Sequence, residues 1–144
     1  MNRIAYFSEI LKDLMIERDL TVSELSSLSG VNVSRIYDYL SGKAPATHNA
    51  IKIANVLKCS LDYLFGFEQE NTLKDDYFLT SDCNQRLKSV IDQSGKSRYK
   101  ISQDTGITQA QLLNWYKGYR IPKLPSLVSL AEYFNCSLDY LVGK

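Results

Sequence analysis

A chain of 144 residues with 44% hydrophobic and 23% charged side chains has the composition of an ordinary globular protein, which argues against disorder. No stretch approaches the roughly 20 apolar residues of a membrane span, and charges interrupt the apolar residues at the N-terminus, unlike in a signal peptide. We therefore expect a cytoplasmic protein. Three cysteines and one histidine are too few for a disulfide framework or a zinc site, so we expect neither a metal nor a cofactor.

The formal net charge of +1 conceals an uneven distribution along the chain. Residues 1–70 carry seven Lys and Arg against nine Asp and Glu, residues 71–82 carry one against three, and residues 83–144 carry nine against four. The last segment therefore has a net charge of +5, whereas each of the other two has −2. This distribution suits a polyanionic partner for the C-terminal half and makes the N-terminal half less suited to one.

The sequence is an internal duplication. CSLDYL occurs at 59–64 and again at 136–141, an offset of 77, and upstream the offset is 76, which pairs Gly30 with Gly106. The second copy therefore has one additional residue, in a segment with two prolines that is typical of a loop.

The duplication predicts two domains, at 1–66 and 83–144. The segment between them, 67–82, is polar and has no clear hydrophobic period, so we interpret it as a linker.

Each copy has the hydrophobic spacing of short helices. In the first copy an apolar stripe begins at Phe7, Thr21 and Glu24 form a capping-box pattern for a second helix, and Asn32 caps a third that runs to Gly42. In the second copy the matching stripe begins at Cys83. The remaining helices of the two copies are expected at 49–58, 60–65, 126–135 and 137–142.

The caps and turns of the second copy follow the same order. Ser97 is the expected N-cap, but Lys100 stands where the capping box needs Glu or Gln, so half of the box is lost. Gly106 ends this short helix, Thr108 caps the next, and Gly118 ends it. We expect five short helices in each copy and an all-α fold.

Several side chains are assigned to the core rather than to a site. Val31 and Ile107 are expected to be buried in the angle between two helices. Cys59 and Cys136 are interpreted as small buried hydrophobic residues. The helical spacing also favours the core for Tyr63, Trp115, Tyr116 and Tyr140.

A short capped helix, a glycine, an apolar residue, a second cap and a second helix form a helix-turn-helix pattern. It occurs as TVSELSSLSGVNVSRIYDYLSG at 21–42 and as SRYKISQDTGITQAQLLNWYKG at 97–118. With the closing CSLDYLxG, these motifs resemble the Cro and phage-repressor (XRE-like) class, over roughly 120 residues of the chain. The resemblance implies two tandem five-helix, lambda-repressor-like domains. It also implies a bacterial or phage transcription regulator that binds double-stranded DNA, as members mostly do as dimers.

The resemblance also implies which residues face DNA. They lie at the start of the first helix of the motif and along the second helix. In the second copy these positions hold Arg98, Gln109, Ala110, Leu113 and Asn114. In the first copy they hold Val22, Val33, Ser34, Tyr37 and Asp38.

The chemistry of these positions differs between the copies. Gln and Asn can bond to adenine N6 and N7, and Ala can pack on a thymine methyl group, so the second copy offers base readers. Asp38 faces a polyanion unfavourably, although a carboxylate can accept from cytosine N4. Phosphate contacts are expected from Lys96, Lys100, Lys117, Arg120 and Lys123 in the second copy, and from Lys43 in the first.

Two hypotheses from different classes stay open. In the first, the protein is a sequence-specific DNA-binding transcription regulator whose second copy is the main reader. In the second, it is a protein-interaction module that has lost DNA binding, at least in its first copy, through which a homodimer or protein partner would bind. An apolar patch of Val22, Val33 and Tyr37 would be unusual on a DNA-facing surface. We therefore expect it to be partly covered by the linker, the second domain or another chain. An enzyme is not expected, because no phosphate-binding glycine loop or catalytic set is recognisable.

Overall fold

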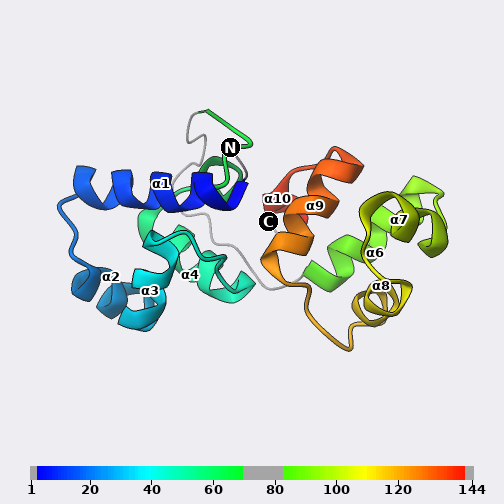
Figure 1. Cartoon of the computed structure of the whole chain (residues 1–144), viewed down its shortest axis with the longest axis horizontal. Coiled ribbons are helices and arrows are strands. Elements are labelled where there is room, and N and C mark those ends of the chain that lie inside the picture. The colour runs from blue at the N-terminus through cyan, green and yellow to red at the C-terminus, as the bar shows by residue number, and fades with distance from the viewer. Residues whose placement is uncertain (1–2, 70–82, 142–144) are drawn as a thin grey trace. The chain divides into compact units, whose positions relative to one another are not determined.

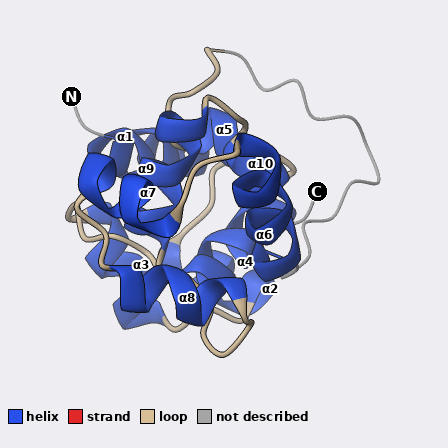
Figure 2. Ribbon diagram, turned by 90° about the vertical axis from the view of Figure 1, so that its right-hand side faces the viewer, coloured by secondary structure: helices blue, strands red, loops and turns tan. Residues whose placement is uncertain are grey.

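The computed structural model describes residues 3–69 and 83–141 (Figure 1). Every regular element in these ranges is an α-helix, as Figure 2 shows. The chain divides into two compact units, Met1–Leu79 and Thr80–Lys144, each with five described helices. The expected all-α fold with two tandem five-helix domains is therefore confirmed. The expected linker at 67–82 lies mostly outside the described residues, and the domain boundaries derived from it stay predictions.

The helices follow the same order in both domains. The first domain contains α1 (Arg3–Glu17), α2 (Val22–Ser29), α3 (Val33–Leu40), α4 (Thr47–Leu57) and α5 (Leu61–Leu64). The second domain contains α6 (Cys83–Ser94), α7 (Arg98–Thr105), α8 (Gln109–Tyr116), α9 (Leu124–Phe134) and α10 (Leu138–Leu141). In the first domain α1 packs on α3 and α5, and α2 packs on α3 and α4. The second domain repeats these contacts, with α6 on α8 and α10, and α7 on α8 and α9.

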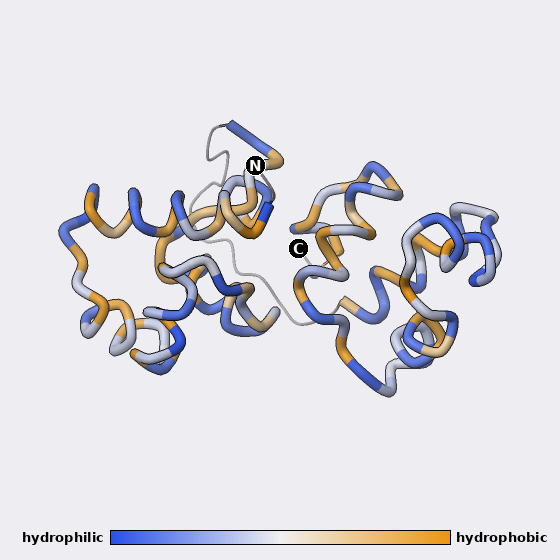
Figure 3. The backbone as a smooth tube through the Cα atoms, in the orientation of Figure 1, coloured by the Kyte–Doolittle hydropathy of each residue, from blue (hydrophilic) through white to orange (hydrophobic). Residues whose placement is uncertain are grey.

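Each helix buries one face against its neighbours. Hydrophobic and hydrophilic residues alternate along the helices of both domains (Figure 3). The side chains at matching core positions are fully buried in both copies: Leu11, Leu25 and Ile36 in the first domain, and Leu87, Ile101 and Leu112 in the second. The duplication therefore preserves the core that holds the helices of each motif together.

One part of the core differs between the domains by an exchange of sizes. In the first domain the Phe7 ring packs edge-on against Tyr39, with ring centroids 6.1 Å apart. At the matching positions the second domain has Cys83 and Trp115, both buried. The smaller side chain on the first helix thus accompanies the larger one on the third. The larger ring on the third helix thus offsets part of the volume lost on the first.

The fourth helix of each domain begins earlier than predicted. We expected starts at 49 and 126, but α4 begins at Thr47 and α9 at Leu124. In α9 this places Pro125 in the first helical turn. Proline is tolerated there because the first amides of a helix have no partner within it, so Pro125 belongs to the helix and not to the loop.

Some of the core predictions are wrong in part. Cys59 is buried as expected, but Cys136 is only half-buried. Tyr63 and Tyr140 are also half-buried, because the single turns of α5 and α10 direct their leucines inward instead. The Tyr140 ring lies under Arg86, whose guanidinium carbon is 4.9 Å from the ring centroid.

Candidate nucleic-acid interface

The turn of each motif is built as the sequence predicts. Gly30 and Gly106 both have a φ of 79°, in the left-handed region that only glycine adopts at little cost. The amide of Gly30 donates to the carbonyl of Ser26, and the second domain repeats this bond. Val31 and Ile107 are buried next to these glycines, as predicted. The turn therefore fixes the angle at which α3 and α8 leave the core.

The starts of the motif helices are capped by side chains. Thr21 and Glu24 form the predicted capping box of α2, and Ser97 caps α7 through the amide of Lys100 alone. The cap of α8 is stronger than we predicted. Thr108 and Gln111 form a complete box there, with Gln111 Oε1 accepting from the Thr108 amide at 3.2 Å. The T-x-x-Q spacing was the signal that could have shown this.

The second domain presents its predicted reading residues on α8. Gln109 and Ala110 are exposed in the first turn, whereas Leu113 and Asn114 are half-buried one turn further along. Arg98 is exposed at the start of α7. Three exposed cations follow α8 and lie at its end, in the loop and at the start of α9: Lys117, Arg120 and Lys123.

Two other predicted phosphate contacts are already engaged within the domain. Lys100 Nζ lies 3.2 Å from Asp104 Oδ1, and Lys96 Nζ lies 3.1 Å from the hydroxyl of Tyr133. That hydroxyl donates to Asp104 Oδ2 at 2.5 Å. The hydrogen bond from Tyr133, and next the two lysines, hold the pKa of Asp104 below its ordinary value. Lys96 and Lys100 therefore offer less positive charge to a phosphate than the sequence suggested.

Tyr116, predicted to be core, is half-buried at the end of α8. Its hydroxyl donates to Asp92 Oδ1 at 2.8 Å, and this hydrogen bond raises the pKa of Tyr116 above its ordinary value. Lys88 Nζ lies 5.2 Å from the centre of the ring. The ring thus ties α8 to α6 and is not presented as a stacking platform.

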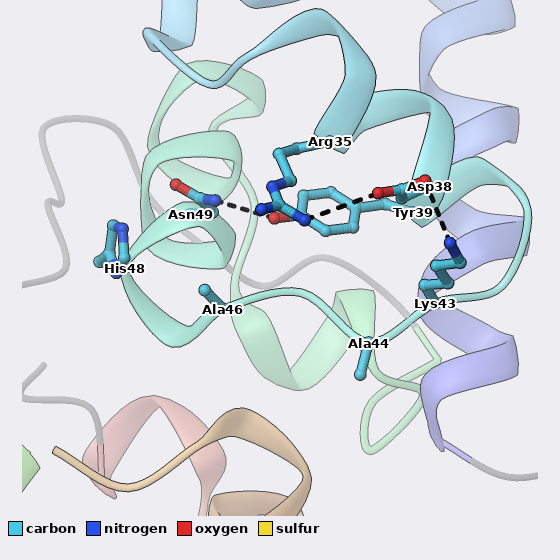
Figure 4. Close-up of a pocket in the computed structure, with 8 residues that line it drawn as sticks. All are labelled: Arg35, Asp38, Tyr39, Lys43, Ala44, Ala46, His48 and Asn49. Carbon is cyan, nitrogen blue, oxygen red and sulfur yellow. Dashed lines mark hydrogen bonds and ion pairs between the residues drawn. The ribbon is translucent and has the colours of Figure 1, made fainter.

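The first domain offers a different set of groups on α3. Ser34 is exposed, but its hydroxyl donates to Asn32 Oδ1 at 2.8 Å, so it reinforces the helix cap. Tyr37 is 59% exposed. Lys43 Nζ lies 3.5 Å from Asp38 Oδ1, and Arg35, which sequence analysis did not single out, lies 3.8 Å from Asp38 Oδ2. Figure 4 shows Asp38 between these two cations.

An open hollow lies at the same place in each domain, beside the second helix of the motif. This helix, α3 or α8, is called the recognition helix below. In the first domain it is lined by α3, by the loop that follows and by the start of α4, including Arg35, Lys43 and Asn49 (Figure 4). In the second domain it is lined by the matching segments, including Arg120 and Lys123. The two domains therefore have a hollow at the same place, lined by different side chains.

The expected cover over the apolar part of the first domain is not supplied by that domain. Val22 is half-buried, but Val33 is 40% exposed and Tyr37 is 59% exposed. Cover by the linker, the second domain or another chain stays a prediction.

Comparison with known proteins agrees with this geometry. The family described as "Helix-turn-helix" matches residues 11–64 and again residues 87–141. The chain belongs to the helix-turn-helix family. The two matches fall on the two domains and include α2–α3 and α7–α8, so the resemblance to the Cro and phage-repressor class is confirmed.

A curated helix-turn-helix relative is the HTH-type transcriptional regulator ImmR of Bacillus subtilis (strain 168). It is 32% identical to this chain over 60 residues, which are 42% of this chain and 47% of ImmR. The match thus spans about half of that protein. No solved structure matches the chain significantly. Among the described residues, no helix of this helix-turn-helix protein is long and apolar enough to cross a membrane.

Proposed function

We propose that this helix-turn-helix protein is a sequence-specific transcription regulator that binds double-stranded DNA, with its second domain as the main reader. The observation that carries the proposal is α8, which presents Gln109, Ala110 and Asn114 on a helix fixed by a complete cap and a glycine turn. An α-helix of this kind fits the major groove of B-DNA, where each base pair has a distinct pattern of donors and acceptors.

The charge distribution supports the same assignment. Residues 83–144 carry nine Lys and Arg against four Asp and Glu. Arg98, Lys117, Arg120 and Lys123 are exposed around α8, where they can neutralise the phosphates on either side of the groove. In the first domain one carboxylate, Asp38, accompanies the cations on the matching surface. The second domain therefore supplies more of the affinity.

The relative supports the class of function. ImmR is described as a transcriptional regulator, and the family as helix-turn-helix, so a binding role is favoured over a catalytic one. Binding to the DNA of a bacterial cell implies a cytoplasmic location. The chain already contains two motifs, so one chain can present two recognition helices, and a homodimer is a further arrangement of the same surfaces.

The test is a titration of the full chain against labelled genomic DNA fragments at two salt concentrations, followed by nuclease protection. We expect discrete footprints and an affinity that falls steeply with salt, because phosphate neutralisation releases counterions. Binding to no fragment at low salt would contradict the proposal.

The first domain has a second candidate role as a protein-interaction surface. The observation in its favour is the exposure of large apolar side chains on that domain, which include Ile16 at 73%, Leu28 at 63% and Tyr37 at 59%. Under this alternative, Tyr37→Ala would abolish self-association or partner binding and leave the affinity for DNA unchanged. Sedimentation of the variant and the parent protein at matched concentrations separates the two roles.

A further inference from the structure

Asp38 and Asn114 stand at matching places on the two recognition helices. They are 76 residues apart, the offset of the duplication, and each directly precedes a buried aromatic residue, Tyr39 or Trp115. The backbone around them is also the same. The Asp38 carbonyl accepts from the Lys43 amide at 3.0 Å, and the Asn114 carbonyl accepts from the Tyr119 amide at 2.9 Å. The two side chains therefore leave the helix from equivalent positions.

Their chemistry is different although their shapes are nearly equal. An ionised carboxylate only accepts hydrogen bonds, whereas a carboxamide donates and accepts. In the major groove a carboxylate matches the N4 amino group of cytosine, and a carboxamide matches N6 and N7 of adenine. The adenine that would satisfy Asn114 therefore does not suit Asp38, because a carboxylate oxygen would face the N7 atom and both are acceptors.

The structure also reduces the electrostatic cost of a carboxylate beside DNA. Asp38 Oδ2 lies 3.8 Å from Arg35 and Asp38 Oδ1 lies 3.5 Å from Lys43, so two cations surround one anion. Asp38 keeps 33% of its side chain exposed, and both contacts are long for hydrogen bonds. The two cations thus offset part of the carboxylate's charge while its lone pairs stay available for a base.

We propose that the two recognition helices read different base pairs, with Asp38 as a cytosine reader where Asn114 reads adenine, so that the site of one chain has two unlike halves. This inference rests on the proposed DNA-binding function. The first position of the two helices also differs in chemistry, because Val33 stands where the second domain has Gln109. A dimer with one motif in each chain reads two like halves related by two-fold symmetry, and a chain with two unlike motifs need not.

The test uses the full chain and a pool of duplexes with a randomised central segment. The parent protein should enrich a site without two-fold symmetry. Asp38→Asn should change the preference at one position of one half-site from cytosine to adenine, by about 5- to 150-fold. Asn114→Asp should cause the reverse change in the other half-site. The matched control is Asp13→Asn, which removes one exposed carboxylate from α1 and should leave every base preference unchanged.

Three outcomes overturn the inference. One is a palindromic site in which each variant alters both halves. A second is an Asp38→Asn protein that binds all duplexes more tightly and by the same factor, since Asp38 would then act only through its charge. The third is an Asp38→Asn protein with unchanged affinity and preference. Failure of the proposed function itself is recognised separately, because the parent protein would then enrich no duplex at all.

Discussion

Ser8 and Asn84 occupy matching positions on α1 and α6, and both donate to backbone carbonyls at the end of a recognition helix. Ser8 Oγ donates to the carbonyl of Leu40 at 2.9 Å. Asn84 Nδ2 donates to the carbonyl of Trp115 at 2.9 Å and to that of Arg120 at 2.8 Å. The last carbonyls of a helix lack partners within it, so these side chains add hydrogen bonds where the helix itself supplies none. In the second domain the same amide also fixes the loop that carries Arg120.

Asn84→Ala should destabilise the second domain by about 0.5–1.5 kcal/mol, because it removes one hydrogen bond to the partly buried carbonyl of Trp115 and one to the exposed carbonyl of Arg120. Trp115 is the only tryptophan of the chain, so its fluorescence during urea unfolding reports on that domain alone. The variant should also bind DNA more weakly, since the Arg120 loop loses its anchor. Ser8→Ala is the control, and it should leave the tryptophan transition where it is. An unchanged transition in Asn84→Ala would mean that water replaces the amide.

Arg98→Ala should weaken binding to all DNA sequences alike. Arg98 is exposed at the start of α7. We propose that it contacts a phosphate there, and such a contact carries no base information. The logarithmic salt slope should fall by about one, as for the loss of one phosphate contact. Lys52→Ala, which removes an exposed charge from α4, is the matched control. A change in base preference would show that Arg98 reaches a base edge instead.

The free energy of unfolding of the second domain should fall at acidic pH because the Asp104 carboxylate becomes protonated. The hydrogen bond from Tyr133, and next the two lysines, lower the pKa of Asp104 in the folded state. A carboxylate whose pKa is lowered by folding stabilises the fold at pH values above its pKa in the unfolded chain. This contribution is lost as the pH falls through its pKa in the folded state. Tyr133→Phe removes the largest cause, so the difference in urea midpoint between parent and variant should shrink from pH 6 to pH 3. A constant difference would contradict this assignment.

Sequence analysis was sufficient for features that depend on local residue order. The duplication, the glycine turns at Gly30 and Gly106, and the caps at Thr21 and Asn32 each follow from a residue type at a fixed position. These features fix the fold class, because a short capped helix and a positive-φ glycine leave few other arrangements.

Two of the contacts that the sequence did not indicate join residues far apart in the chain. Asn84 reaches a carbonyl 36 residues away, and Lys96 reaches a hydroxyl 37 residues away. No local pattern indicates which distant partner a polar side chain meets, which is why Lys96 was predicted to be available for phosphate. The pair of Lys100 and Asp104 is different, because its i,i+4 spacing on one helix is a local signal that could have shown it. Arg35 could likewise have been identified from the sequence, because it stands three residues before Asp38 on the same helix.

Gln109→Ala should reduce affinity in a way that depends on one base pair. Gln109 is exposed in the first turn of α8, and its carboxamide can bond to N6 and N7 of one adenine. Truncation should cost about 1–3 kcal/mol for the preferred site and relax the preference at that position, while the salt slope stays unchanged. The matched variant is Val33→Ala on α3, which removes only apolar atoms at the equivalent position and should change affinity less. Both are measured by titrating labelled duplexes that differ at single base pairs. If Val33→Ala costs more than Gln109→Ala, the first domain is the main reader and the assignment made from charge is wrong.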